Sequence, residues 1–266
     1  MKIDYQETTN DLLTRIDIHK KYGGRDIDQW MLQLLNPQKG SRILDIGCGS
    51  GKQCFLFDKA LEGNADIMGG DVNSKLLQQA RQENAKIGNR IKFIDLDFNR
   101  HFHIDNNMYD LVTSCFAIYY SEVIPYTISE MHRVIKPGGR LFTTGPMPEN
   151  KRLFYDIILE ATHKPIPPMP GSSRYSSLIL GEIQKLFTKV EIHVFENPLT
   201  FETVEPFLDY TRASLSEDRR LWKNLFGGAE GFDQVMQAIK TVAENRLSEE
   251  GKLVMTKVVG GFLATK

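Results

Sequence analysis

A run of alternating glycines carries the clearest chemical signal in this sequence. Residues 43–46, which are apolar except for Asp45, are followed by Gly47, Gly49 and Gly51, and residues 52–61 then have a helical pattern. Glycine lets a backbone turn tightly and approach a ligand without a Cβ in the way. The first N–H groups of the following helix are free to donate to that ligand. The segment therefore predicts a ligand-binding loop between a strand and a helix.

Two acidic residues follow later apolar stretches at positions suited to a nucleoside. Asp71 comes after the second stretch, twenty residues beyond Gly51, where a carboxylate can bind ribose hydroxyls. Asp97 follows the third stretch, where it can accept a hydrogen bond from an adenine amino group while Phe98 covers the ring. Enzymes that bind nicotinamide cofactors also use an acidic residue to bind ribose. Asp71 therefore indicates a nucleoside ligand but does not distinguish which one.

The elements that position these residues alternate along the first half of the chain. Alternating strands and helices predict a parallel sheet that is covered on both faces. The expected strands are residues 42–46, 65–69, 91–94, 111–115 and 140–144, and the expected helices are residues 52–61, 73–87 and 121–135.

The remainder of the chain has longer helical stretches and two more strand-like runs. We expect a single domain over residues 1–266, with helical decorations on one sheet. Residues 163–174 contain four prolines and predict a loop. The expected parts are an N-terminal helical lid (1–37), the core (38–146), two helical insertions (147–188 and 202–250) and the last strands (189–201 and 252–266).

At this point residues 40–146 resemble the core of the class I S-adenosylmethionine-dependent methyltransferases, of the small-molecule type. The resemblance rests on Ile43–Gly51, Asp71, Asp97, Tyr109–Val112 and Ile135–Gly139. It implies an α/β fold with a doubly wound, mostly parallel seven-stranded sheet, an antiparallel last strand, N-terminal helices and a helical cap. It also implies that S-adenosylmethionine is the cofactor and S-adenosylhomocysteine the product.

The resemblance also implies roles for individual residues. The backbone of the glycine loop would line the methionine part of the cofactor, and Asp45 would orient that loop. The cofactor residues implied in this way are Gly47, Cys48 and Gly49 for the methionine part, Asp71 and Val72 for the ribose, Asp97 and Phe98 for the adenine, and Cys115 and Phe116 for the sulfonium.

Other candidates are less specific. Tyr22 and Arg25 are candidates for binding the cofactor. Arg25 would reach the cofactor carboxylate, or it forms a surface salt bridge. Tyr119 and Tyr120 follow the fourth strand, and either contact the acceptor or pack. Arg174 would bind an anionic acceptor, or it is an ordinary loop residue.

No general base is identifiable from the sequence, so the catalytic residue is unknown. Small-molecule methyltransferases often carry a histidine after the fourth strand, and this chain has tyrosines there. An Asn/Asp-Pro-Pro-Tyr/Phe motif is also absent at that position, which disfavours modification of adenine N6 in DNA. The six histidines show no ligand spacing, so no metal site is expected.

Composition narrows the choice of partner. Lys plus Arg is 33 and Asp plus Glu is 34, a balance that argues against a large nucleic-acid surface. The polar first ten residues do not form a signal peptide, and no apolar run approaches the roughly 20 residues of a membrane span. Three cysteines predict no disulfide framework. We therefore expect a cytoplasmic protein without a membrane or nucleic-acid partner.

The favoured function is methyl transfer to a small-molecule metabolite. The alternatives are RNA or protein methylation, a non-catalytic module that binds S-adenosylmethionine, and a nicotinamide oxidoreductase. The Gly-x-Gly-x-Gly spacing disfavours the last of these, since dinucleotide enzymes use Gly-x-Gly-x-x-Gly. The acceptor, the atom that is methylated and the oligomeric state are not determined by the sequence.

Overall fold

A computed structural model of the 266-residue chain describes residues 9–164, 170–215 and 229–266. It divides into two compact units. The core unit comprises residues 26–147, 171–195 and 259–266, and the accessory unit comprises residues 1–25, 148–170 and 196–258. Each unit is considered by itself.

The chain forms one seven-stranded sheet with the strand order β3-β2-β1-β4-β5-β7-β6. Strands β1 to β5 pair in parallel, and β7 pairs antiparallel with β5. The predicted sheet with an antiparallel last strand is therefore confirmed. The strands are β1 (Arg42–Ile46), β2 (Asp66–Asp71), β3 (Lys92–Asp95), β4 (Tyr109–Cys115), β5 (Ile135–Pro146), β6 (Lys189–Phe201) and β7 (Leu253–Thr265).

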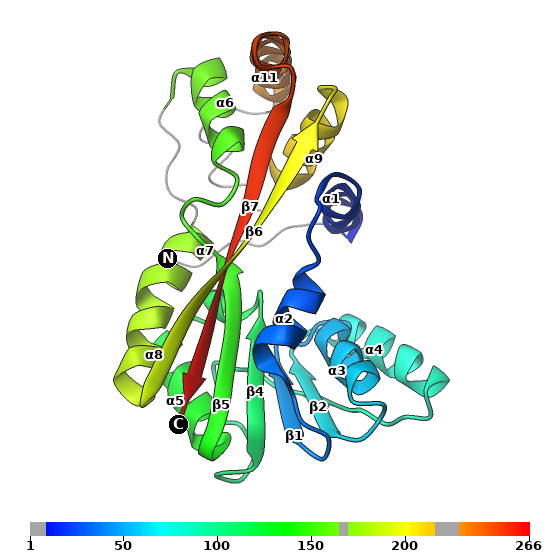
Figure 1. Cartoon of the computed structure of the whole chain (residues 1–266), viewed down its shortest axis with the longest axis vertical. Helices are drawn as coiled ribbons and strands as arrows, with labels where there is room; N and C mark the ends of the chain where they lie inside the picture. Colours follow the sequence, from blue (N-terminus) through cyan, green and yellow to red (C-terminus); the bar gives the residue numbers. More distant parts are fainter. Residues whose placement is uncertain (1–8, 165–169, 216–228) are drawn as a thin grey trace. The chain divides into compact units, whose positions relative to one another are not determined.

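Helices cover the first five strands because short apolar strands leave both faces of the sheet to be buried. In Figure 1, α3 and α4 lie beside β1 and β2, while α5 and α8 lie near β5. Asn73 caps α4 by accepting from the N–H groups of Lys75 and Leu76, as the sequence predicts. The helices are α2 (Ile27–Leu35), α3 (Lys52–Ala60), α4 (Ser74–Lys86), α5 (Ile124–Val134) and α8 (Leu180–Leu186), with a short 3-10 helix η1 at Ile118–Tyr120.

One apolar core lies between the sheet and helices α2, α3 and α4. Met31 and Leu35 of α2 and Phe57 of α3 are buried in it, together with Ile43 and Leu111 from β1 and β4. This core holds the first turn of α3 against the end of β1. It therefore fixes the loop that joins them.

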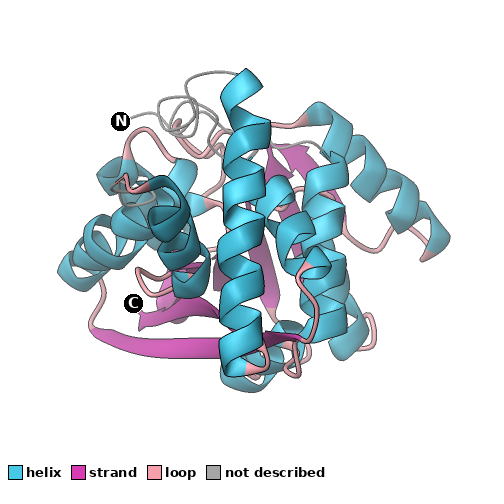
Figure 2. Cartoon of the chain, turned by 90° about the horizontal axis from the view of Figure 1, so that it is seen from above, coloured by secondary structure: helices cyan, strands magenta, loops and turns pink. Residues whose placement is uncertain are grey.

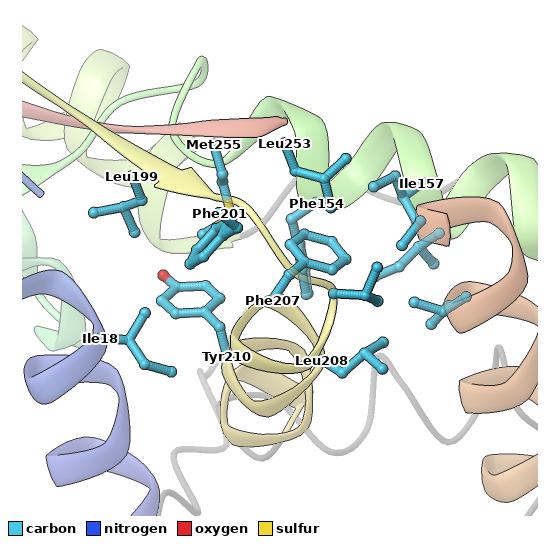
Figure 3. Close-up of a cluster of buried hydrophobic side chains, with 14 of the residues drawn as sticks. Ile18, Phe154, Ile157, Leu199, Phe201, Phe207, Leu208, Tyr210, Leu253 and Met255 are labelled. Atoms are coloured by element: carbon cyan, nitrogen blue, oxygen red, sulfur yellow. The ribbon is translucent and has the colours of Figure 1, made fainter. Parts of the chain in front are cut away.

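The accessory unit contains helices, the last residues of β6 and the first residues of β7. Figure 2 shows the strands and helices of the chain in different colours. Its own apolar cluster includes Phe154, Phe207 and Tyr210 packed with the strand residues Leu199 and Met255 (Figure 3). Its helices are α1 (Thr9–Tyr22), α6 (Arg152–Thr162), α9 (Glu205–Leu215) and α11 (Ala229–Glu250).

The predicted loop at residues 163–174 is wrong at its end. Residues 165–169 lie outside the described part of the chain, but α7 (Pro170–Ser173) and a π-helix η2 (Arg174–Ile179) follow directly. The tertiary reason is Tyr175, whose fully buried ring stacks on Phe262 at 4.4 Å and whose hydroxyl donates to the Thr143 carbonyl at 2.7 Å. Arg174 therefore lies at the start of a packed helix and not in a loop.

Candidate functional site

The glycine loop lies at the carboxyl end of β1, next to the end of β2. The N–H groups of Gly47 and Cys48 both donate to the Gly70 carbonyl, at 2.8 and 3.1 Å. The N–H of Gly49 donates to Oδ2 of Asp71 at 2.8 Å. In the strand order, β1 has β2 on one side and β4 on the other, so this is the place where a doubly wound sheet changes direction and binds its ligand.

Two of the glycines are required here for different reasons. Gly47 has φ of 73°, and a Cβ on it would lie 2.4 Å from Cβ of Ala117. Gly49 has φ of 55°, and a Cβ on it would meet only Cδ1 of Leu76, at 3.8 Å. The loop is therefore packed on its β4 side at Gly47 and open at Gly49. This arrangement leaves room for a ligand against the backbone at Gly49.

The side chain of Cys48 does not face that open side. Cys48 is 4% exposed and belongs to the apolar core. A Cβ on Gly69 of β2 would lie 2.9 Å from its sulfur. Any contact of Cys48 with a cofactor would therefore go through its backbone. The sequence analysis also expects a backbone contact at this residue.

Asp71 is the last residue of β2 and is half-buried. Its Oδ2 accepts from the N–H of Gly49, and its Oδ1 accepts from the N–H of Asn73 at 2.8 Å. Each carboxylate oxygen has a second lone pair that can accept a ligand hydroxyl. Val72 beside it is 63% exposed, which is high for an apolar side chain. Both residues lie at the carboxyl end of β2, next to the glycine loop.

Asp97 and Phe98 lie just beyond β3, which ends at Asp95. Oδ1 of Asp97 accepts from the N–H of Asn99 at 2.9 Å, and Oδ2 lies 3.2 Å from Nε of the exposed Arg100. Cε1 of Phe98 would be 3.7 Å from a Cβ on Gly47, so the ring faces the glycine loop. The structure therefore brings Phe98 and the glycine loop together.

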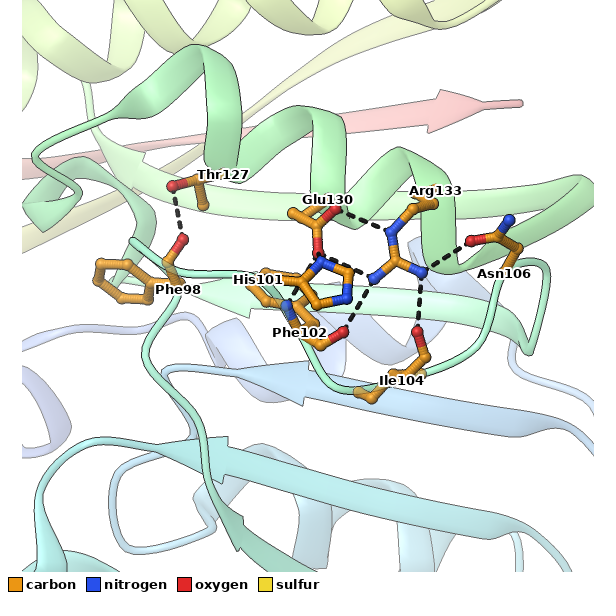
Figure 4. Close-up of polar contacts among 8 residues, drawn as sticks. All are labelled: Phe98, His101, Phe102, Ile104, Asn106, Thr127, Glu130 and Arg133. Atoms are coloured by element: carbon orange, nitrogen blue, oxygen red, sulfur yellow. Dashed lines mark hydrogen bonds and ion pairs between the residues drawn. The ribbon is translucent and has the colours of Figure 1, made fainter.

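A buried ion pair holds the segment after Phe98 against α5 (Figure 4). Glu130 accepts from Nε and one terminal nitrogen of Arg133, both at 2.8 Å, and from the N–H of Phe102 at 2.8 Å. Arg133 also donates to the carbonyls of Phe102 and Ile104, at 2.9 and 2.7 Å. The bonds to Arg133 lower the pKa of Glu130, so the pair stays ionised.

A second set of bonds fixes Phe98 itself. The hydroxyl of Thr127 donates to the Phe98 carbonyl at 2.8 Å (Figure 4). Oδ1 of Asn99 accepts from the N–H of Glu122 at 2.8 Å. The loop between β3 and β4 is thus anchored at both ends, which orients Phe98. None of these anchors was a candidate in the sequence analysis, because their partners are about 20 to 30 residues away in the chain.

Asp45 is the fourth residue of β1 and is 1% exposed. Its Oδ1 accepts from the hydroxyl of Thr113 on β4 at 2.7 Å. Burial raises the pKa of the Asp45 carboxyl to about 7, and the charge of Asp71 contributes in the same direction. Asp45 links β1 to β4 directly below the glycine loop.

The end of β4 supplies the third side of the site. Cys115 is buried, with its sulfur 3.9 Å from the sulfur of Met31 on α2. Burial raises the pKa of the Cys115 thiol, so this thiol is neutral near pH 7. Phe116 follows with φ of 57°, a conformation that is unfavourable for a side chain of this size and is often found at functional sites. Met31 had no role in the sequence analysis.

The acceptor candidates of the core unit lie close together. Tyr119 and Tyr120 form η1 with ring centroids 4.6 Å apart, and Tyr119 is buried edge-on against Tyr175 at 6.4 Å. Arg174 donates to the carbonyl of Ser121, immediately after η1. The structure therefore brings Arg174 to the two tyrosines, although they are more than 50 residues apart in the chain.

Tyr22 and Arg25 belong to the accessory unit. Tyr22 packs on Phe201 with centroids 5.2 Å apart. Arg25 donates from its guanidinium to the Glu196 carbonyl at 2.8 Å, and its N–H donates to Oδ1 of Asn197 at 3.1 Å. Their predicted contact with a cofactor stays a prediction.

The described residues also bear on whether the chain holds a metal ion or crosses a membrane. Among the described residues, no group of three or more His, Cys, Asp or Glu side chains could hold a metal ion. His101 and His103 pack edge-on at 5.5 Å, and His101 lies 3.0 Å from Glu130. Within the same described ranges, no helix has the length and apolar character needed to cross a membrane.

The chain is similar to known proteins both in sequence and in fold. Residues 43–139 match a family described as "Methyltransferase domain". A demethylmenaquinone methyltransferase from Staphylococcus epidermidis is 30% identical over 109 residues, which are 41% of this chain and 44% of that protein. The matched part thus spans less than half the length of this curated relative.

Solved structures extend the likeness in fold beyond the matched segment. The YcgJ protein of Bacillus subtilis has a TM-score of 0.58 at 12% identity, over 90% of this chain and 97% of that one. A phosphoethanolamine N-methyltransferase of Haemonchus contortus, solved with phosphomonomethylethanolamine and S-adenosylhomocysteine, has a TM-score of 0.54 at 17% identity, over 96% and 57% of the two chains.

The matched segment contains the glycine loop, Asp71, Asp97 and the turn at Pro137–Gly139. The seven strands and the antiparallel β7 are those that the resemblance implies. Residues 43–139 are therefore similar to a methyltransferase domain, and the chain has the Rossmann-like fold of these solved structures.

Proposed function

We propose that this protein transfers a methyl group from S-adenosylmethionine to a small-molecule acceptor. The observation that carries the proposal is the pairing of the open backbone at Gly49 with the carboxylate of Asp71, inside the segment that matches the methyltransferase family. The related Staphylococcus epidermidis protein is a methyltransferase by name, and the Haemonchus contortus structure contains S-adenosylhomocysteine. Both support the same cofactor here.

The residues of the core unit fit the parts of that cofactor. The open backbone of Gly47–Gly49 would hold the methionine part, with Asp45 supporting the loop from below. Asp71 would accept from the ribose hydroxyls beside the exposed Val72, and Asp97 and Phe98 would hold the adenine. The end of β4, with Cys115, Phe116 and the neighbouring Met31, would surround the sulfonium.

The chemistry asks little of the protein beyond alignment. The bound cofactor supplies an electrophilic methyl group, which an acceptor attacks in line with the departing sulfur. Holding two reactants in this geometry can lower a barrier by several kcal/mol. Tyr119, Tyr120 and Arg174 would position the acceptor, and Arg174 favours an anionic group on it. An acceptor that is already a carboxylate, amine or thiolate needs no external base.

Calorimetric titration with S-adenosylhomocysteine and, separately, with NAD tests the cofactor. We expect a micromolar dissociation constant for S-adenosylhomocysteine, about −7 to −9 kcal/mol, and no heat with NAD. Absence of binding at millimolar S-adenosylhomocysteine would reject the cofactor assignment.

The acceptor requires a separate experiment. Wild-type protein would be incubated with methyl-labelled cofactor and pools of carboxylic acids, amines, phenols, quinols and thiols, with RNA and protein as further arms. Label that moves to a small molecule supports the proposal. Label that moves only to RNA or protein, or cofactor binding without transfer to any arm, contradicts it.

A further inference from the structure

A buried group of polar side chains lies inside the accessory unit, apart from the residues assigned to the cofactor. Tyr210 and Ser214 on α9 are 0% and 2% exposed. The hydroxyls of both, and Nδ1 of His19 on α1, have no hydrogen-bond partner among the residues that the structure describes. Buried polar groups in proteins are nearly always hydrogen-bonded, so three unpartnered groups in one unit indicate a missing partner.

These groups are close to one another. The ring of His19 packs edge-on against the ring of Tyr210, with centroids 5.4 Å apart. Ser214 is one helical turn after Tyr210, so both side chains point to the same side of α9. Figure 3 shows the Tyr210 hydroxyl directed toward the side of the cluster where Ile18 of α1 lies. The neighbour of Ile18 in the chain is His19.

A lysine is buried beside this group. Lys151 is 7% exposed, and its Nζ lies 5.4 Å from the ring centroid of Tyr210 and 5.9 Å from that of Phe154. Its φ of 63° is a left-handed conformation that costs energy in a residue other than glycine. The N–H of Lys151 donates to the Thr256 carbonyl at 2.9 Å, which holds the backbone in place.

The charged residues that shift the pKa of His19 are all cations. The pKa of His19 is lowered to about 2, mainly by burial and in smaller part by the positive charges of Lys257, Lys151 and Arg15. His19 is therefore neutral at pH 7, and the three cations make the local potential more positive. A neutral imidazole and two hydroxyls can donate hydrogen bonds to an anion that such a potential attracts.

We propose that the accessory unit binds the carboxylate or phosphate group of a small molecule at His19, Lys151, Tyr210 and Ser214. The lysine supplies a buried charge, and the hydroxyls and imidazole supply hydrogen bonds of fixed direction. The side chains come from two helices and from the residue before α6, so the fold itself assembles the site. This site is independent of the proposed methyl transfer, since none of its residues is assigned to the cofactor or the methyl acceptor.

The test uses the full chain and two probes, inorganic phosphate and acetate, titrated at constant ionic strength against chloride. Thermal unfolding and calorimetry would follow binding. We expect one of the two anions to bind saturably, with a dissociation constant of about 1 mM. A stronger response to phosphate identifies a phosphate ligand, and a stronger response to acetate identifies a carboxylate.

Two variants and a control make the test specific. Tyr210→Phe removes one buried oxygen and should weaken anion binding about fivefold, and Lys151→Met should weaken it about tenfold or more. Lys240→Met on α11 should leave binding unchanged, because Lys240 is half-exposed and its Nζ lies 3.6 Å from Oε1 of Glu244. The affinity for S-adenosylhomocysteine, measured in the same variants, should also be unchanged.

The result that overturns the proposal is equally definite. If the cluster serves only packing, neither anion binds saturably, and Tyr210→Phe raises the unfolding temperature with no effect on anion affinity. Should Lys151→Met fail to fold, Tyr210→Phe still decides, because it preserves the shape of the ring. A loss of S-adenosylhomocysteine binding in wild-type protein would instead bear on the proposed function alone.

Discussion

Replacement of Asp71 by alanine tests the cofactor site most directly. In the structure both carboxylate oxygens are already engaged, by the N–H groups of Gly49 and Asn73 at 2.8 Å each. The variant thus loses these bonds and the bonds proposed to the ribose hydroxyls. A hydrogen bond to a charged group contributes about 1.5–3 kcal/mol. Because Asp71 is half-exposed, we take about 2–3 kcal/mol for the ribose pair together, which is about a 30- to 150-fold loss of affinity.

The assay is calorimetric titration with S-adenosylhomocysteine, combined with urea unfolding to measure the free energy lost from the loop itself. Asp66→Ala is a matched control, because Asp66 begins the same strand. Its side chain is 63% exposed and pairs with the neighbouring surface residue Arg42 at 3.0 Å. It lies five residues from Asp71, roughly 16 Å along the strand. A folded Asp71→Ala variant that binds within twofold of wild type would refute the proposed ribose contact.

Three further changes test the loop, its support and the acceptor side. Gly47→Ala should lower the free energy of unfolding by about 1–3 kcal/mol more than Gly40→Ala. Both glycines have positive φ (73° and 82°), but only at Gly47 would a Cβ lie against a neighbour. Equal losses for the two variants in urea unfolding would contradict this packing. The folded pKa of Asp45 is raised from 3.8 to about 7, so the free energy of unfolding of the wild type should fall as pH rises from about 4 to 7. Asp45→Asn should remove that slope and so gain up to about 4 kcal/mol relative to wild type by pH 7. If the free energies of unfolding of the two proteins change in parallel with pH, Asp45 does not titrate in that range. Tyr119→Phe and Tyr120→Phe should alter turnover more than cofactor affinity, and the reverse outcome would place these rings at the cofactor.

The Asp45 prediction depends on the sign of its pKa shift. Between the unfolded pKa near 3.8 and the folded pKa near 7, the folded protein holds a proton that the unfolded chain releases. Stability therefore decreases with rising pH across that interval and levels off above it. Asparagine keeps an acceptor for the Thr113 hydroxyl, so the hydrogen bond at 2.7 Å is preserved while the charge is removed.

The sequence by itself determined the parallel sheet and the glycine loop in the first half of the chain. The glycines after residues 43–46, the acids at Asp71 and Asp97 and the strand–helix alternation predict a parallel sheet with a ligand loop, and that sheet is confirmed. These signals are local, because turn geometry, helix capping and strand burial each depend on residues that are near in the chain.

Only the tertiary structure decided which distant side chains support that loop. Ala117 limits Gly47, Met31 meets Cys115, and Thr113 supports Asp45, each across strands or layers. No spacing in the chain encodes such contacts, since they depend on strand order and on how helices pack across the sheet.

The segment before α8 is a second case in which contacts between distant residues decided the local structure. Its prolines predict a loop, but Tyr175 stacks on Phe262 nearly 90 residues later and bonds the Thr143 carbonyl of β5. Burial of one aromatic ring with its hydroxyl satisfied outweighs the local preference for an irregular chain. The sequence shows the composition of this segment, whereas the partner that orders it is supplied only when β5 and β7 come together in the sheet.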